Sequence, residues 1–369
     1  MKHYLVIAGL LVSLGASAQS NVQIYGAADA TFDVVKTSGA SNRGTFNRVN
    51  SNSSILGFRG SEDLGNGLSA IFQLESGINL DSTGGVPSTG RTSFVGIKSA
   101  NYGTVVFGLL SSPTREVGAA LDLNTGVTGP GSNSSIIGKV TGGSGASTFD
   151  TRLQNAVAYI SPTINGLTTT VAYSAGENRS LENAKPADKI NTKGYDFGLK
   201  YTVGPIDTYV SYAILNNNRD DEAAGSNINK VNVVRTAAVY NYGVANKVTF
   251  LIERDKNEYS GIKAAEIDRV IWGLGVKHYV TTNGAIITQY YQAKDPSGSY
   301  YDVNGNRGAR LIEIGYEHSL SKRTILKATY ATMRNEANAN YDFNTGAVGG
   351  GVVAGTDLSV LSVGMRHSF

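Results

Sequence analysis

Short segments of alternating polarity recur along the whole chain. In YDFGLKYTV, residues 195–203, aromatic and aliphatic side chains take the odd positions, whereas Asp196, Gly198, Lys200 and Thr202 take the even ones. The segments NVQIYGAADATF, LSAIFQLES and TILKATYATM show the same period of two. This is the period of a β-strand with one apolar and one polar face. The pattern therefore predicts an all-β protein.

Connections with turn chemistry separate these segments in a regular order. Short turns such as Asp63–Gly67, Gly204–Pro205 and Thr282–Gly284 alternate with longer polar loops. The loops fall near residues 36–50, 80–90, 111–151, 176–193, 216–229, 255–267, 294–308 and 334–356. Counting both kinds predicts sixteen antiparallel strands, seven short turns and eight long loops. An even strand number with short turns at one end and long loops at the other is typical of a transmembrane β-barrel.

A secreted β-sandwich or propeller would also show alternation and glycine turns. Its apolar face, however, should resemble a protein core in size and composition. Here the apolar face is mixed with Ala, Thr and Gly, and the opposite face carries charges on nearly every segment. The 20 tyrosines also suit a membrane interface, where an apolar ring and a wet hydroxyl are both satisfied. The sequence therefore favours the barrel.

The first 18 residues have the features of a secretory signal peptide. Lys2 is followed by an apolar run from Tyr4 to Leu14 and by the small residues Ala16, Ser17 and Ala18. The run is too short to span a bilayer as a helix. We expect residues 19–369 to form a single barrel domain. The absence of cysteine excludes disulfides and thiolate metal sites, and a formal charge of +3 gives no argument for nucleic acid.

Five stretches carry a family resemblance. NVQIYGAADATF, LGFRGSEDLGNGLSAIFQLESGI, RTSFVGIKSANYGTVVFG, GYEHSLSKRTILKATY and SVGMRHSF resemble the trimeric porins of the neisserial and β-proteobacterial type. The resemblance implies a homotrimer in the Gram-negative outer membrane, in contact with lipid and lipopolysaccharide. It also implies passive diffusion of small hydrophilic solutes and ions, without a cofactor. The third loop, residues 111–151, would fold into the lumen as a constriction.

Strand parity predicts which charged side chains face water, because charges are costly on the lipid face. Both signs occur on the inner parity, which favours a wide aqueous path. The residues concerned are Asp29, Arg59, Glu75, Lys98, Arg152, Asp196, Lys200, Asp207, Arg235, Lys247, Glu253, Glu313, Lys327 and Arg366.

The resemblance further implies a basic ladder on the wall that faces the third loop. Arg91 and Arg152 occupy positions of such rungs. Arg91 shares the parity of Val95, so a bulge or a loop-end location is needed to turn it inward; otherwise it is a rim or trimer-contact residue. The third loop would add Arg115, Glu116, Asp122 and Lys139 to the constriction. Such charges set ion selectivity at the narrowest point of a pore. We expect a modest preference for anions.

Two departures from the family pattern weaken that expectation. Ile55 and Leu109 stand where the family commonly has arginine, and Ile55 shares the inner parity of Arg59. A partly apolar eyelet would suit a channel that prefers organic anions, for example aromatic acids. A surface protein whose loops bind host or phage is a third possibility, which a lack of conductance would favour.

Catalysis finds no support in the sequence. After the signal peptide the only histidines are His278, His318 and His367, none forms a local metal-binding pair, and no G-x-S-x-G motif occurs. The last segment instead predicts a role in assembly. SVLSVGMRHSF alternates up to Phe369, so we expect it to pair with the first strand and close the barrel. Phe369 would lie in an aromatic girdle and resembles the signal that the outer-membrane assembly machinery reads.

Overall fold

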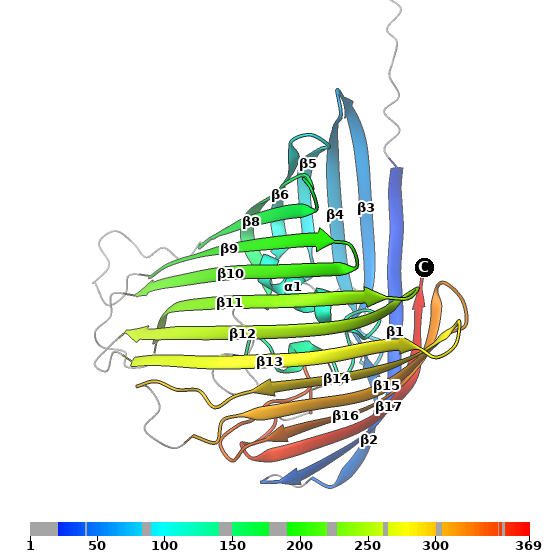
Figure 1. The fold of residues 1–369 in the computed structure, drawn as a ribbon, viewed down its shortest axis with the longest axis vertical. Coiled ribbons are helices and arrows are strands. Elements are labelled where there is room, and N and C mark those ends of the chain that lie inside the picture. The colour runs from blue at the N-terminus through cyan, green and yellow to red at the C-terminus, as the bar shows by residue number, and fades with distance from the viewer. Residues whose placement is uncertain are drawn as a thin grey trace, which may run out of the picture.

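The chain folds into one closed antiparallel sheet in the computed structural model (Figure 1). The structure describes residues 21–40, 43–82, 90–139, 150–176, 190–219, 227–260, 265–299, 305–345, 347–348 and 351–369. Residues 1–18, the expected signal peptide, lie outside these ranges.

Seventeen strands are assigned within the described residues. They are β1 (Asn21–Gly39), β2 (Thr45–Ser51), β3 (Ser54–Gly65), β4 (Leu68–Ile78), β5 (Ser93–Ser99), β6 (Gly103–Ser111), β7 (Arg152–Ile160), β8 (Leu167–Ala175), β9 (Ile190–Val203), β10 (Ile206–Arg219), β11 (Asn227–Tyr242), β12 (Asn246–Ser260), β13 (Ala265–Tyr279), β14 (Gly284–Ala293), β15 (Ala309–Ser319), β16 (Thr324–Asn335) and β17 (Thr356–Ser368). A short helix α1 (Pro113–Leu121) and a 3-10 turn η1 (Asn133–Ser135) lie in the third loop.

Strands β2 and β3 are two halves of one barrel strand. Both pair with β1, β2 along its second half and β3 along its first. The pairing shifts by one residue where Asn52 and Ser53 interrupt the strand, and Ser53 has a left-handed φ of 53°. This is the geometry of a β-bulge. The barrel therefore has sixteen strands, as predicted.

Pairing of the first strand with the last closes the barrel. The ladder between β1 and β17 runs from Ala27 opposite Ser368 to Gly39 opposite Thr356. With that ladder in place, every barrel strand has a partner on both sides. No sheet edge then exposes unpaired backbone N–H and C=O groups to lipid.

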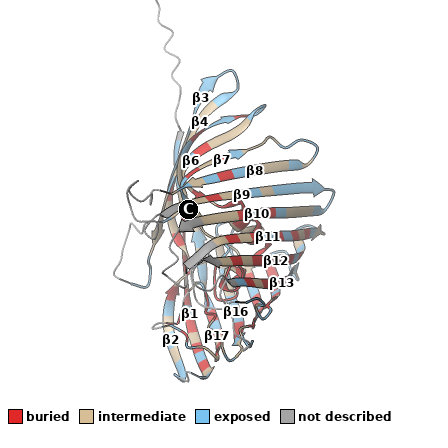
Figure 2. Cartoon of the chain, turned by 90° about the vertical axis from the view of Figure 1, so that its left-hand side faces the viewer, coloured by how far each residue is buried: buried red, intermediate tan, exposed pale blue. Residues whose placement is uncertain are grey.

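The two faces of the sheet differ as the alternation predicts. The outward parity carries exposed apolar side chains such as Val95, Ile97 and Phe107, which are 59%, 53% and 55% exposed. Exposed and buried positions alternate along the strands in Figure 2. An exposed apolar belt around a closed barrel is the surface that lipid covers.

Several strands extend further than the sequence predicted. The expected loops at 36–50, 216–229 and 255–267 shrink, because β1 continues to Gly39, β10 to Arg219 and β12 to Ser260. Their polar tips pair as regular ladders. At one tip, cross-strand pairs of opposite charge join Arg254 with Asp268 and, at 3.1 Å, Lys256 with Glu266. Such pairs stabilise a ladder even where no apolar face is buried. The predicted strands therefore ended too early, because these tips were interpreted as loops on account of their low hydrophobicity.

Two loops fold onto the inner wall. The third loop lies between β6 and β7, and the eighth lies between β16 and β17. Their buried side chains form one cluster with inner-face residues of β10 to β17; we call it the inner cluster. Its members include Val117, Leu121, Ile136 and Ile137 from the third loop, Tyr341 and Phe343 from the eighth, and Leu251, Ile271, Leu311, Met333 and Leu358 from the strands. Among the described residues, no helix has the length and hydropathy needed to cross a bilayer.

Candidate pore lining and constriction

The third loop enters the barrel through a capped helix. The Ser112 hydroxyl accepts a hydrogen bond from the Arg115 backbone N–H at 3.0 Å, and Pro113 opens the first turn. Serine at the cap and proline at the first position both favour a helix start. Val117 and Leu121 then face the wall, whereas Glu116 remains exposed. The helix therefore packs its apolar side on the wall and turns the side with Glu116 toward the lumen.

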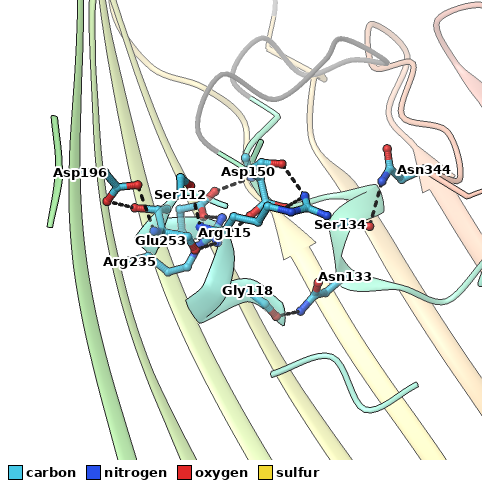
Figure 3. Close-up of polar contacts among 12 residues, drawn as sticks. Ser112, Arg115, Gly118, Asn133, Ser134, Asp150, Asp196, Arg235, Glu253 and Asn344 are labelled. Atoms are coloured by element: carbon cyan, nitrogen blue, oxygen red, sulfur yellow. Dashed lines mark hydrogen bonds and ion pairs between the residues drawn. The ribbon is translucent and has the colours of Figure 1, made fainter. Parts of the chain in front are cut away.

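A buried charge cluster anchors α1 to the wall (Figure 3). Arg235 on β11 is fully buried and contacts Glu253 on β12, with Nε to Oε2 at 2.5 Å. Its Nη1 also donates to Asp150 Oδ1 at 2.8 Å and to the Thr114 carbonyl at 2.6 Å. The cluster therefore joins both ends of the third loop to two neighbouring strands.

Further carboxylates hold the loop along the wall. Asp196 on β9 accepts hydrogen bonds from the Thr114 hydroxyl at 2.8 Å and its backbone N–H at 3.0 Å. Glu317 on β15 accepts from the Thr125 hydroxyl at 2.7 Å and pairs with Lys277 at 2.6 Å. The sequence placed Asp196 and Glu253 on the inner face, and the structure does the same. It adds that they bind the third loop.

The eighth loop covers the wall beside the third. Arg269 on β13 donates to the Tyr341 hydroxyl, and both side chains are buried. Asn344 links the two loops through bonds to the hydroxyls of Ser135 at 3.0 Å and Ser134 at 3.1 Å (Figure 3). A large part of the interior is therefore filled. The wide aqueous path expected from parity alone is wrong for this half of the barrel, because the inner face of β10 to β17 also carries aliphatic side chains that the loops cover.

Two charges expected at the constriction lie within this packing. Asp122 and Lys139 are only 8% and 9% exposed. Burial raises the pKa of the Asp122 carboxyl above its ordinary 3.8. Hydrogen bonds from Ser132, Asn124 and Asn133 act in the opposite direction, but burial has the larger effect. Burial likewise lowers the pKa of the Lys139 ammonium below 10.5. Both side chains are therefore largely withdrawn from water, and the Asp122 carboxylate binds the loop's own backbone at Asn124 and Asn133.

The two basic residues predicted to form the ladder, Arg91 and Arg152, lie on the opposite side of the barrel, the side formed by β1, β3, β4 and β7. Arg91 lies just before β5 and turns inward, with its Nε 3.7 Å from the Glu75 carboxylate. Arg152 begins β7, and its Nε donates to the Thr92 hydroxyl at 3.2 Å. Arg91, Arg115, Glu75 and Glu116 all lie close enough to act electrostatically on Arg152. A loop-end position thus turns Arg91 inward, as the ladder requires.

Tyr25, which sequence reasoning did not single out, organises this side. Its hydroxyl donates to Glu75 Oε1 at 2.8 Å, and the Arg59 guanidinium stacks 4.8 Å from its ring centroid. The ring lies over Gly57, where any Cβ would clash with it. Tyr25 shares the parity of Asp29, so the alternation of the strand already predicts that its side chain faces the lumen.

Ile55 also faces inward, since β1 pairs it with the buried Ala27. Leu109 does not: it pairs with Ser93 on the outward parity, whereas Leu110, on the parity of the buried Val106, lies in an inner apolar cluster. The apolar contact expected from Leu109 is therefore supplied by Leu110.

The other predicted wall charges are spread along the strands. Asp29 accepts contacts from Lys327 at 2.5 Å and Arg366 at 3.2 Å, so one carboxylate neutralises one of two cations. Lys200 pairs with Asp207 at 3.6 Å, and Lys98 pairs across the sheet with Ser69 near the short turns. Of these residues, Arg366 lies close enough to Arg91 to act on it electrostatically.

A closed barrel with an apolar outside and a charged interior defines a transmembrane channel. Comparison with known proteins names its family. A family model described as Gram-negative porin matches residues 5–339, and the chain belongs to that family. It is thus an outer-membrane pore for passive diffusion.

Individual relatives agree over the full length. The chain is 29% identical to outer membrane porin protein 32 of Delftia acidovorans, with all of both chains covered. It is 25% identical to the major outer membrane protein P.IB of Neisseria meningitidis serogroup B, with 99% of each covered. A solved anion-selective porin from Comamonas acidovorans superposes with a TM-score of 0.79 at 26% identity, covering 95% of this chain and all of that one. Two of these three proteins are named as porins, and the third is named as a major outer membrane protein.

Proposed function

We propose that this pore prefers small anions over cations, and that the four arginines on its uncovered side determine this preference. Arg59, Arg91, Arg115 and Arg152 line that side together with the acids Glu75 and Glu116. Glu75 is already engaged by Tyr25 and Arg91. The surplus of guanidinium groups beside the aqueous path is the observation that carries the proposal.

The third loop acts in this proposal as the constriction, because it is held across the interior by strands β9 to β15. The short turns would face the periplasm and the long loops the outside. Residues 1–18 would be removed on export. No catalytic role is included: His278, His318 and His367 lie on the outward parity beside the short turns.

Reversal potentials in a salt gradient across a planar bilayer test the anion preference. Chloride should permeate faster than potassium. A potential of the opposite sign would refute the anion preference, and the absence of any conductance would refute a pore altogether and favour a surface-binding role for the loops.

The same proposal includes a homotrimer, supported by the resemblance to trimeric porins. Gel migration before and after boiling tests it. An unboiled sample that already migrates as the monomer would refute the trimer. Assembly would depend on Phe369 and the outer-membrane assembly machinery.

A second candidate is a channel with a preference for organic acid anions. The specific observation that favours it is the apolar character of the inner wall next to the arginines, where Ile55, Leu110 and Phe94 lie. Saturation of the current by an aromatic carboxylate, with no saturation by chloride, would distinguish this candidate from a general pore.

A further inference from the structure

A recess of about 550 Å³ lies on the inner wall between α1 and strands β4 to β10. Its lining is mainly apolar and includes Ile71, Phe94, Val106 and Ala158 from the strands and Val117 and Ala120 from α1. Pockets of this size that bury small ligands are typically apolar with a few polar groups. In a water-filled channel, such a surface favours a solute with an apolar body.

The recess is on the lumen side of the sheet. Val106 pairs with Gly96 and Ala158, on the parity of Lys98 and opposite to that of Phe107. Val105 and Phe107, its neighbours in sequence, point to the apolar outer surface. A ligand in the recess would therefore come from the pore and not from the bilayer.

The Arg152 guanidinium lies next to the recess, in contact with its lining residue Thr92. Thr92, which lines the recess, accepts the hydrogen bond from Arg152, and Arg152 pairs across the sheet with the lining residue Ser111. Within the described residues, no carboxylate lies within ion-pair distance of Arg152, whereas Arg91 has Glu75 and Arg115 has Asp150. Arg152 is thus the cation that remains available to a solute anion.

The other charges at the recess agree with this choice. Lys200 at the far end is already paired with Asp207 at 3.6 Å. Glu116 also lines the recess, but it is exposed to water, where screening weakens its repulsion. Arg91 and Arg115 both lie close enough to act on the Arg152 position. An anionic head would therefore lie at the Arg152 end.

We infer that the recess is a binding site for amphipathic organic anions, an aromatic monocarboxylate being the matching class, with the ring among Phe94, Val106 and Ala120 and the carboxylate at Arg152. This inference rests on the proposed pore function. Ile55 and Leu109 stand where the family commonly has arginine, and the recess explains how such a porin can still distinguish among anions. Apolar contact gives an organic anion additional affinity, which chloride cannot gain.

Single-channel recording with the full chain in potassium chloride tests the site, with sodium benzoate as the probe and sodium acetate as the comparison. Benzoate should block the current reversibly and saturably, at a concentration about tenfold below that needed for acetate, because the ring adds apolar burial. Equal block by the two would overturn the site, since both carry the same carboxylate.

Two variants locate the block. Val106→Thr keeps the side-chain shape but adds a hydroxyl to the recess, so benzoate block should weaken about threefold or more. Ala120→Leu fills the recess from the loop helix, outside the strands, and should reduce benzoate block to the acetate level. The matched control is Val233→Thr, an equally buried inner-face valine of β11 outside the recess.

The outcomes distinguish a failure of the recess as a binding site from a failure of the pore function. Normal conductance without benzoate block overturns the recess and leaves the pore intact, whereas no conductance overturns the pore. If both recess variants retain the same block as Val233→Thr, benzoate binds elsewhere and the assignment is wrong.

Discussion

The backbones of Gly26 and Phe369 exchange two hydrogen bonds of 3.1 Å, and the Phe369 ring occupies the space where Gly26 would carry a Cβ. An ideal Cβ on Gly26 would lie 2.5 Å from the ring and 2.5 Å from the Ile55 carbonyl oxygen. The first strand thus contacts the last strand on one side and β3 on the other at this residue. Its lack of a side chain lets the three strands meet.

Loss of this contact should impair assembly more than transport. Deleting Phe369 removes both hydrogen bonds and the ring, so the yield of folded protein in the outer membrane should fall severalfold, with normal conductance in the channels that do form. Comparing heat-modifiable protein with single-channel current checks this. A normal yield after the deletion would show that Phe369 is dispensable.

Substitution at Gly26 should act through the backbone. Gly26→Ala forces a shift against Ile55 and should destabilise the barrel by about 1–3 kcal/mol, the usual cost of overpacking. Urea unfolding in detergent measures the change. Gly67→Ala is the comparison, since a Cβ there meets no atom within 4 Å, although its φ of 75° adds some backbone strain.

Removing Arg235 should loosen the third loop. Arg235→Met leaves Glu253 buried without its partner and Asp150 with Arg115 alone, at 3.7 Å; breaking a buried pair in this way costs about 3–5 kcal/mol. We expect a lower unfolding temperature and noisier single-channel current. Arg254→Met, which breaks an ion pair with a 66% exposed arginine on the outer parity of β12, should change both little. Equal effects of the two would contradict the anchoring role.

Neutralising Arg152 should weaken the proposed anion preference. Arg152→Gln removes one unit of charge beside the path, so the chloride-to-potassium permeability ratio should fall by about two- to fivefold, as expected for a charge a few ångströms from the ions in water. Reversal potentials report the ratio. Arg152→Lys keeps the charge and should retain the preference; a loss as large as that of the glutamine variant would point to shape instead.

Acidification should stabilise the third loop through Asp122. Because burial raises the pKa of this carboxyl above 3.8, the folded state binds its proton more readily than the unfolded state does. The contribution of Asp122 to stability is therefore greatest at low pH and falls as pH rises through the raised value. Unfolding temperatures of the wild type and Asp122→Asn should diverge as pH rises above 3.8, the ordinary pKa of the carboxyl. Parallel curves would contradict this origin of the pH dependence.

Residues in regular strands were predictable because a period of two assigns each side chain to a face. Asp29, Glu75, Lys200 and Lys327 lie on the inner parity as expected. The same rule is interrupted in β7, where one extra residue beside Asn155, whose φ is 47°, shifts the register by one between Ala156 and Leu153, and the sequence there contains no sign of it. Parity propagates an error of one position to every later side chain in the strand.

Loop residues could not be assigned in this way. Asp122, Lys139, Tyr341 and Phe343 lie in segments without a period, and their burial results from contacts between distant parts of the chain. The charges of the third loop were expected at the aqueous constriction because the family resemblance places that loop in the lumen, and a loop ordinarily keeps its charged side chains in water. Inside a barrel that expectation reverses, since the lumen offers an inner wall against which a loop can fold.

The inner cluster has a consequence for how such a channel can change. The sixteen-stranded circumference fixes the outer shell and its contact with lipid, whereas Leu121, Ile137, Tyr341 and Phe343 determine how much of the interior stays open. Substitutions in these loop residues can alter the free cross-section without disturbing strand register, closure or insertion. Permeability and biogenesis are thus encoded in separate parts of one chain, and each can vary while the other is kept.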